Sequence, residues 1–140
     1  MKFWDSSAVV PLLVAEPKQK RMLSLLDRDP AMAVWWGTPV EVHSAIARLE
    51  RSRHLSTDKA SEALDRLAML AASWVEILPT PRVRKAAQRL LRVHPIRAAD
   101  ALQLAAAVTA LDGESSAKEF VCLDADLSEA AKREGFRVVQ

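Results

Sequence analysis

Short apolar segments alternate with longer amphipathic segments along the chain, and this pattern predicts strands that alternate with helices. Segments with the length and composition of strands lie at 2–4, 33–36, 75–78, 119–123 and 136–139. Helical periodicity is found at 6–15, 18–26, 38–53, 57–72, 82–92, 96–111 and 126–134. Such alternation is typical of a parallel sheet covered on both faces. The sequence therefore predicts an α/β three-layer sandwich with a central, mostly parallel sheet of about five strands.

Local signals set several of the predicted boundaries. Pro17 separates the first two helices, because proline lacks a backbone donor and clashes with the preceding turn. Thr80 and Pro81 form an N-cap and a first helical position, and Gly113, within the polar segment 112–116, is the predicted stop of the helix before it. The sequence contains neither a G-x-G-x-x-G nor a G-x-x-x-x-G-K-[ST] motif, so neither a dinucleotide-binding fold nor a P-loop is indicated.

The composition is that of a single globular domain spanning residues 1–140. Half of the residues are hydrophobic, which excludes a disordered chain, and the single Cys122 excludes an internal disulfide and a cysteine-based zinc cluster. The net charge of +2 argues by itself neither for nor against a nucleic-acid partner. The longest apolar run, 8–15, is far shorter than the roughly 20 residues of a membrane helix, so we expect a cytoplasmic protein without a membrane partner.

Four acidic residues stand where predicted strands end or where the following helices begin. Asp5 and Asp124 directly follow predicted strands, and Glu41 and Asp100 lie near the starts of predicted helices. Ligands of open α/β sheets bind beyond the carboxyl ends of the strands. We therefore expect these four carboxylates to converge at one edge of the sheet.

Converging carboxylates repel one another unless a cation lies among them. Oxygen ligands suit hard divalent ions such as Mg²⁺ or Mn²⁺, which promote hydrolysis of phosphodiester bonds. The candidate catalytic residues are therefore Asp5, Glu41, Asp100 and Asp124, with Asp5, Asp100 and Asp124 as candidate metal ligands.

The two acids nearest the N-terminus also have structural interpretations. Glu41 follows Thr38 by three residues, with Pro39 at the first helical position, which is the pattern of a capping box. Asp5 could cap the next helix, and one residue can serve both as cap and in the site.

The other two acids have structural interpretations as well. Arg97 could be the partner that a carboxylate at Asp100 needs in a segment that otherwise looks buried. Either Asp124 or Asp126 could be the N-cap of the last helix. Asp126 suits that role better, because Leu127 begins the apolar periodicity.

Several segments, in order along the chain, resemble the PIN-domain ribonucleases, and most closely the short VapC-type toxins of toxin–antitoxin pairs. They are FWDSSA at 3–8, TPVEV at 38–42, IRAADALQLA at 96–105, FVCLDADL at 120–127 and the ending at 130–138. The RAADAL stretch is the most specific of them. The resemblance implies a central parallel sheet, an acidic pocket that holds Mg²⁺ or Mn²⁺, and endonucleolytic cleavage of RNA.

The resemblance also carries the family's acidic residues onto the four acids named above and its small polar residue onto Ser7. Asp126 is a further acid that could support the pocket. Where the family often has Thr or Ser, this chain has Cys122, which removes a hydroxyl. The resemblance further implies a homodimer and a cognate VapB-like antitoxin that blocks the pocket, often with a basic side chain. Its candidate binding surface is formed by helices within 6–28 and 38–72.

Between Glu76 and Asp100 the chain has basic residues and no acid. One interpretation is a face that contacts RNA phosphates; the other is an ordinary solvated helix face. The candidate RNA contacts are Arg82, Arg84, Lys85, Arg89 and Arg97.

Other polar and aromatic residues are predicted to have structural roles. The basic residues near the end of helix 38–53, which are Arg48, Arg51 and Arg53, are explained by the helix dipole. The tryptophans beside strands, which are Trp4, Trp35 and Trp36, are predicted to lie mostly in the core. Cys122 is expected to be buried, and the three histidines are expected to be non-catalytic: His43, His54 and His94.

The favoured hypothesis is a metal-dependent endoribonuclease, as the toxin of a toxin–antitoxin pair. The alternatives are a non-catalytic nucleic-acid-binding or protein-binding module on the same scaffold, and a PIN nuclease that acts in RNA processing or on DNA.

Overall fold

Five parallel strands form one sheet in the computed structural model, which describes residues 1–111 and 118–140. The predicted polar segment 112–116, with Gly113, lies outside the described residues. The strand order is β3-β2-β1-β4-β5, and every neighbouring pair is parallel. The strands are β1 Lys2–Trp4, β2 Met32–Trp35, β3 Val75–Ile77, β4 Glu119–Val121 and β5 Arg137–Val139.

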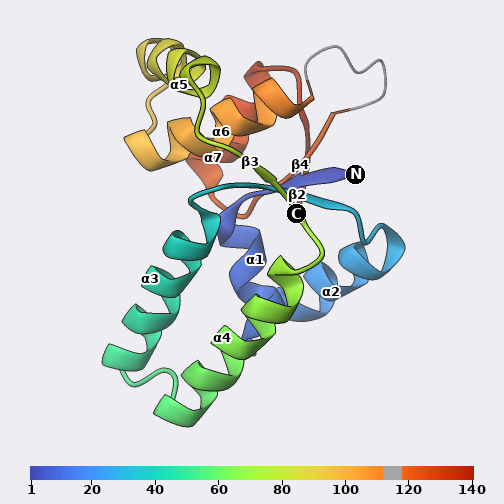
Figure 1. Ribbon diagram of the computed structural model, residues 1–140, viewed down its shortest axis with the longest axis vertical. Helices are drawn as coiled ribbons and strands as arrows, with labels where there is room; N and C mark the ends of the chain where they lie inside the picture. The colour runs from blue at the N-terminus through green and yellow to red at the C-terminus, as the bar shows by residue number, and fades with distance from the viewer. Residues whose placement is uncertain (112–117) are drawn as a thin grey trace.

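Helices cover both faces of the sheet, as Figure 1 shows, with α1 to α4 on one face and α5 to α7 on the other. Their bounds are α1 Ser6–Leu13, α2 Gln19–Arg28, α3 Thr38–Arg51, α4 Thr57–Ala71, α5 Pro81–Val93, α6 Ala98–Ala110 and α7 Ala125–Arg133. The predicted α/β three-layer sandwich is therefore confirmed. None of the helices in these ranges combines the length and apolar character needed to cross a membrane.

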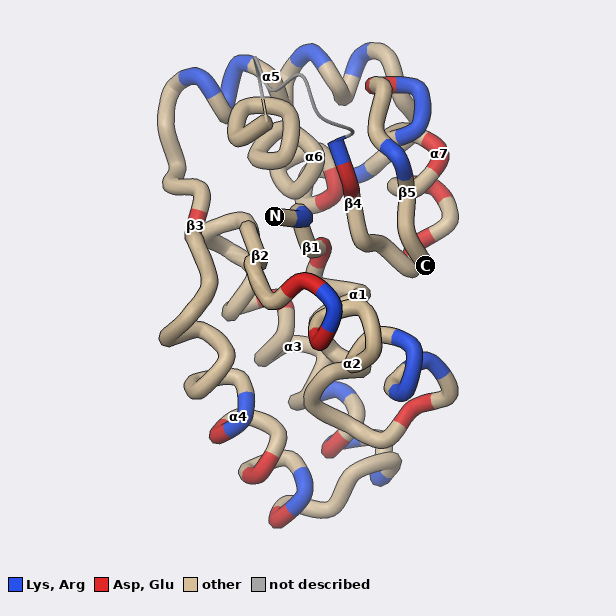
Figure 2. Tube along the Cα trace, turned by 90° about the vertical axis from the view of Figure 1, so that its right-hand side faces the viewer, with Lys and Arg blue, Asp and Glu red and all other residues tan. Residues whose placement is uncertain are grey.

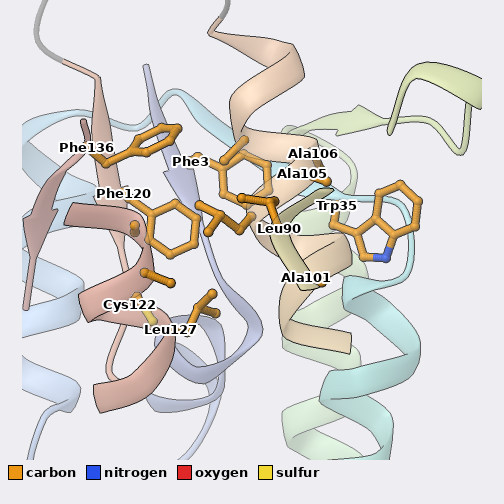
Figure 3. Close-up of a cluster of buried hydrophobic side chains, with 14 of the residues drawn as sticks. Phe3, Trp35, Leu90, Ala101, Ala105, Ala106, Phe120, Cys122, Leu127 and Phe136 are labelled. Carbon is orange, nitrogen blue, oxygen red and sulfur yellow. The ribbon is translucent and has the colours of Figure 1, made fainter. Parts of the chain in front are cut away.

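Alternating side chains along each strand build two hydrophobic cores, because successive residues point to opposite faces of a sheet. Phe3 and Phe120 belong to the core under α5 to α7, whereas Trp4 and Val121 belong to the core under α1 to α4. The rings of Phe3 and Phe120 stack across neighbouring strands at 5.5 Å, and Phe136 meets Phe120 edge-on at 5.6 Å (Figure 3).

The prediction that all three strand-associated tryptophans lie in the core is wrong for Trp36. Trp4 and Trp35 are 0% and 6% exposed, but Trp36 is 51% exposed. Trp36 is the first residue after β2, where the run of buried strand positions ends. Its backbone N–H donates to the carbonyl of Ile77, and its ring meets Trp35 edge-on at the rim of the sheet.

Gly135 ends α7 in a Schellman motif. Its N–H donates to the carbonyl of Lys132, and the N–H of Phe136 donates to the carbonyl of Ala131. The motif requires a left-handed residue, and Gly135 has a φ of +89°. It turns the chain so that Phe136, 5% exposed, enters the core.

Gly135→Ala should lower the free energy of unfolding by about 1 kcal/mol, because a Cβ is strained in the left-handed region. No other atom lies within 4 Å of a Cβ built at this position, so backbone strain alone is tested. Gly135→Asn is the matched control, because asparagine tolerates this conformation better than alanine. Denaturant unfolding of the three proteins is the measurement, and an alanine variant as stable as wild type would contradict the prediction.

Candidate active site

The four acids predicted to converge do line one cavity of about 490 Å³ at the carboxyl edge of the sheet: Asp5, Glu41, Asp100 and Asp124. Asp5 follows β1, and Asp124 lies between β4 and α7. Glu41 and Asp100 lie in the first turns of α3 and α6. Four elements far apart in the sequence therefore contribute one carboxylate each.

Asp5 is both the N-cap of α1 and the most deeply buried acid of the cavity, at 3% exposed. Its Oδ2 accepts hydrogen bonds from the N–H and the hydroxyl of Ser7. The Ser7 hydroxyl in turn accepts the N–H of Leu123 at 2.9 Å, which ties the start of α1 to the end of β4. Burial raises the pKa of Asp5, although these hydrogen bonds oppose the shift.

Glu41 does not form the predicted capping box. Gly37, not Thr38, is the N-cap of α3, and Glu41 Oε2 accepts a hydrogen bond from the Ser6 hydroxyl at 2.9 Å. Thr38 is fully buried, and its hydroxyl oxygen accepts a hydrogen bond from Nε2 of Gln103 at 3.2 Å. Burial raises the pKa of Glu41, while hydrogen bonds from Ser6 and Gln103 oppose the shift.

Asp100 is held by the main chain of Arg97. The N–H of Arg97, the N-cap of α6, donates to Asp100 Oδ2 at 3.2 Å. The predicted helix start at 96 is corrected to Ala98. Residues 97–99 are exposed, whereas Asp100 is half-buried and Ala101 is fully buried, so the segment is buried only from Asp100 onward. Partial burial nevertheless raises the pKa of Asp100, with a contribution from the charge of Asp124, and the positive charge of Arg97 opposes the shift.

Asp124 is the N-cap of α7, which corrects the preference for Asp126. Its Oδ1 accepts the N–H of Leu127 at 2.8 Å. Asp126 lies in the first turn of α7 and lines a different, smaller cavity beside His94. It therefore stands outside the wall of the acidic cavity, although its charge contributes to the raised pKa of Asp100.

Cys122 is fully buried at the base of the site, as predicted. Its Sγ lies 3.7 Å from Asp5 Oδ2 and 3.8 Å from the Ser7 hydroxyl. Burial and the charge of Asp5 raise the pKa of the Cys122 thiol to about 12. The thiol is therefore a neutral weak donor at neutral pH and no nucleophile.

The donor set fits a hard divalent ion. In the described parts of the chain, no three His, Cys, Asp or Glu side chains are gathered tightly enough to hold a metal among themselves. However, Asp5, Asp100 and Asp124 each use one carboxylate oxygen for hydrogen bonds to the protein, and their other oxygens have no such bond to described residues. Mg²⁺ is commonly bound by one or two carboxylates and completes its shell with water and substrate oxygens, for which the cavity has room.

Three residues of the site were not predicted from the sequence: Ser6, Gln103 and Arg48. Ser6 and Gln103 hydrogen-bond within the site, and Arg48 lines the cavity together with Ser44. Arg48 was attributed to the helix dipole alone. Its spacing of seven residues from Glu41, with Ser44 between them, was the signal that would have placed it on the same helix face.

Most of the predicted RNA-contacting residues lie on α5, whose positive charges run along the top of the molecule in Figure 2. No residue of α5 is among the described residues that line the acidic cavity. Arg89 forms two hydrogen bonds to the carboxylate of Glu134, at 2.6 and 3.1 Å, and His94 Nε2 lies 2.7 Å from the same carboxylate. Among the candidates, Arg97 lies beside the cavity, through its contact with Asp100.

The fold and the acidic cavity agree with a family match. The profile of the PIN domain matches residues 2–133, so the chain belongs to the PIN-domain family, a family of nucleases. No curated protein sequence matches this chain.

Solved structures extend the similarity over the whole chain. A toxin–antitoxin complex from Klebsiella pneumoniae has a TM-score of 0.69 at 17% identity, covering 100% of this chain and 97% of the other. FitAcB from Neisseria gonorrhoeae has a TM-score of 0.69 at 18% identity, with coverage of 100% and 97%. FitAB bound to an IR36 DNA fragment has a TM-score of 0.67 at 18% identity, with coverage of 99% and 94%. At these identities the likeness supports the fold.

The raised pKa of Asp5 predicts that this residue lowers the stability of the metal-free protein more at high pH than at low pH. The folded state binds this proton more tightly than the unfolded chain, so stability is lost as the pH rises through the folded pKa. Asp5→Asn keeps an oxygen for the Ser7 hydrogen bonds and removes the charge. We expect it to raise the thermal midpoint over wild type more at about pH 8 than at about pH 4.

Thermal unfolding in the presence of a chelator measures this difference. Groups with lowered pKa values, such as Asp29, Glu119 and Glu134, lose their stabilising effect as the pH falls, but both proteins share them and their contribution cancels. A difference between the two midpoints that stays constant over the pH range would contradict the prediction.

Proposed function

We propose that this protein is a Mg²⁺- or Mn²⁺-dependent endoribonuclease that hydrolyses RNA phosphodiester bonds. The observation that carries the proposal is the single cavity lined by Asp5, Glu41, Asp100 and Asp124 in a PIN-domain fold. These acids come from the segments that carry the family resemblance. The convergence of four carboxylates in this cavity supports catalytic roles for them.

Asp5, Asp100 and Asp124 would hold the ion through the carboxylate oxygens that make no protein hydrogen bond. A divalent ion bound there supplies Lewis-acid activation of water and of the phosphoryl group, and stabilises charge on the leaving 3′ oxygen. Glu41, oriented by Ser6, faces the same cavity and can accept a proton or bind a water. Ser7 holds Asp5 in one orientation through two hydrogen bonds.

The structure removes one of the two arguments for a non-catalytic module. That interpretation rested in part on a capping role for Glu41, which instead bonds Ser6 at the cavity. It also rested on the missing hydroxyl at Cys122. The neighbouring Ser7 hydroxyl already bonds Asp5 and the N–H of Leu123, so the hydrogen bonds around Asp5 are made without it.

We further propose that the protein is a cytoplasmic toxin, that it forms a homodimer, and that a small antitoxin blocks the cavity with a basic side chain. Support comes from the similar fold found in the toxin–antitoxin complex from Klebsiella pneumoniae. A cavity with four carboxylates and raised pKa values at Asp5, Glu41 and Asp100 is also a favourable place for a partner's cation.

Asp100→Asn should lower RNA cleavage by at least about 100-fold and reduce the rise in thermal midpoint that saturating Mg²⁺ produces. The amide keeps an oxygen for the Arg97 N–H, so the fold should be unchanged. Asp65→Asn, an exposed acid on α4, is the control and should retain both properties. Metal-independent cleavage by the double variant Asp5→Asn with Asp100→Asn would contradict the proposal.

Co-expression tests the partner. The purified chain should have the mass of a dimer in light scattering. Its complex with the small protein encoded beside it should cleave no RNA until the partner is removed. A complex as active as the free chain, measured on the same RNA, would contradict the antitoxin proposal and leave the nuclease proposal standing.

A further inference from the structure

Arg48 is the one basic side chain among the described residues that line the acidic cavity. It is exposed, and it also lines a neighbouring cavity of about 240 Å³ together with Glu16. Within residues 1–111 and 118–140 its guanidinium makes no hydrogen bond or ion pair, either with the four cavity carboxylates or with Glu16. A positive charge therefore faces the site without a partner from the protein.

Several other arginines of the described chain are bound to protein groups. Arg89 pairs with Glu134, Arg133 with Glu129 and Arg137 with Glu119. Arg66 donates to the carbonyl of Leu13. What distinguishes Arg48 is its position, because among the described residues it is the arginine that lines the acidic cavity. Its planar fork of donors matches two oxygens of a phosphate group.

The position of Arg48 on α3 relates it to the acids. Glu41, Ser44 and Arg48 share one face of the helix, and seven residues span about 10 Å along the axis. Side chains on a helix lean toward its N-terminus, so Arg48 extends back toward Glu41. A nucleic-acid backbone at the cavity brings further phosphates close to the carboxylates. Each of these phosphates is negatively charged and needs a positive charge near it.

We propose that Arg48 binds an RNA backbone phosphate next to the phosphate that is cleaved, so that the substrate follows α3 from Glu41 toward Arg48. This inference rests on the proposed nuclease function and adds a substrate-binding residue to it. Arg48 contacts a neighbouring phosphate, whereas the aspartates bind the metal.

Steady-state cleavage of a short single-stranded RNA of mixed sequence tests this role. Arg48→Ala should raise KM about tenfold, the loss expected for one charged hydrogen-bonded contact, with kcat and the Mg²⁺-induced rise in thermal midpoint nearly unchanged. Arg48→Lys should recover part of the loss, because it keeps the charge without the fork. Arg51→Ala, which removes an exposed charge from the last turn of the same helix, is the matched control and should leave KM unchanged.

Salt dependence gives a second readout that a structural role would not change. In the Asp100→Asn background, fluorescence anisotropy of the same RNA should show that Arg48→Ala lowers the slope of log affinity against log salt by about 0.7, as for one lost phosphate contact. Arg51→Ala should keep the slope.

The outcomes separate this inference from the proposed function. An Arg48→Ala variant with the KM and salt slope of Arg51→Ala would overturn the inference, as would a loss confined to kcat. If the wild-type protein cleaves no RNA, the proposed function fails, and the salt slopes still decide whether Arg48 contacts a phosphate.

Discussion

The hydroxyl of Ser7 joins the ends of two neighbouring strands, and the candidate site depends on this contact. It donates to the carboxylate of Asp5 after β1 and accepts the N–H of Leu123 after β4. Burying a carboxylate as deeply as Asp5 is costly unless it is hydrogen-bonded, and Ser7 supplies two hydrogen bonds to its Oδ2. The same contact also fixes the turn that leads to Asp124. One small side chain therefore makes the buried charge tolerable and sets its distance from a second acid.

The three aspartates of the cavity all have a structural role at the start of a helix. Asp5 and Asp124 cap α1 and α7, and Asp100 bonds the first N–H at the start of α6. Each carboxylate meets the positive end of a helix dipole, which partly compensates for placing several negative charges together. Because each group bonds the protein through one oxygen, an amide at any of these positions can preserve that hydrogen bond while removing the charge.

Much of the fold could be predicted from the sequence because the alternation of strands and helices is strong. Convergence of the acids could also be predicted, since the carboxyl ends of parallel strands share one edge. The contacts of Thr38 and Glu41 could not, because their partners are distant in the sequence: Gln103 is 65 residues from Thr38, and Ser6 is 35 residues from Glu41. The exposure of Trp36 depends on where β2 ends, because a shift of one residue in the end of the strand decides whether Trp36 belongs to it. The choice of Asp124 over Asp126 as cap depends on the same kind of boundary.

Cys122 gives the site a property that its sequence position does not suggest. Oxidants and electrophiles attack the thiolate form of cysteine. With a pKa of about 12, this thiol is almost entirely protonated at neutral pH, and its side chain has no exposed surface. The sulfur atom beside Asp5 therefore offers oxidants and electrophiles neither a thiolate nor an accessible surface next to the acidic cavity.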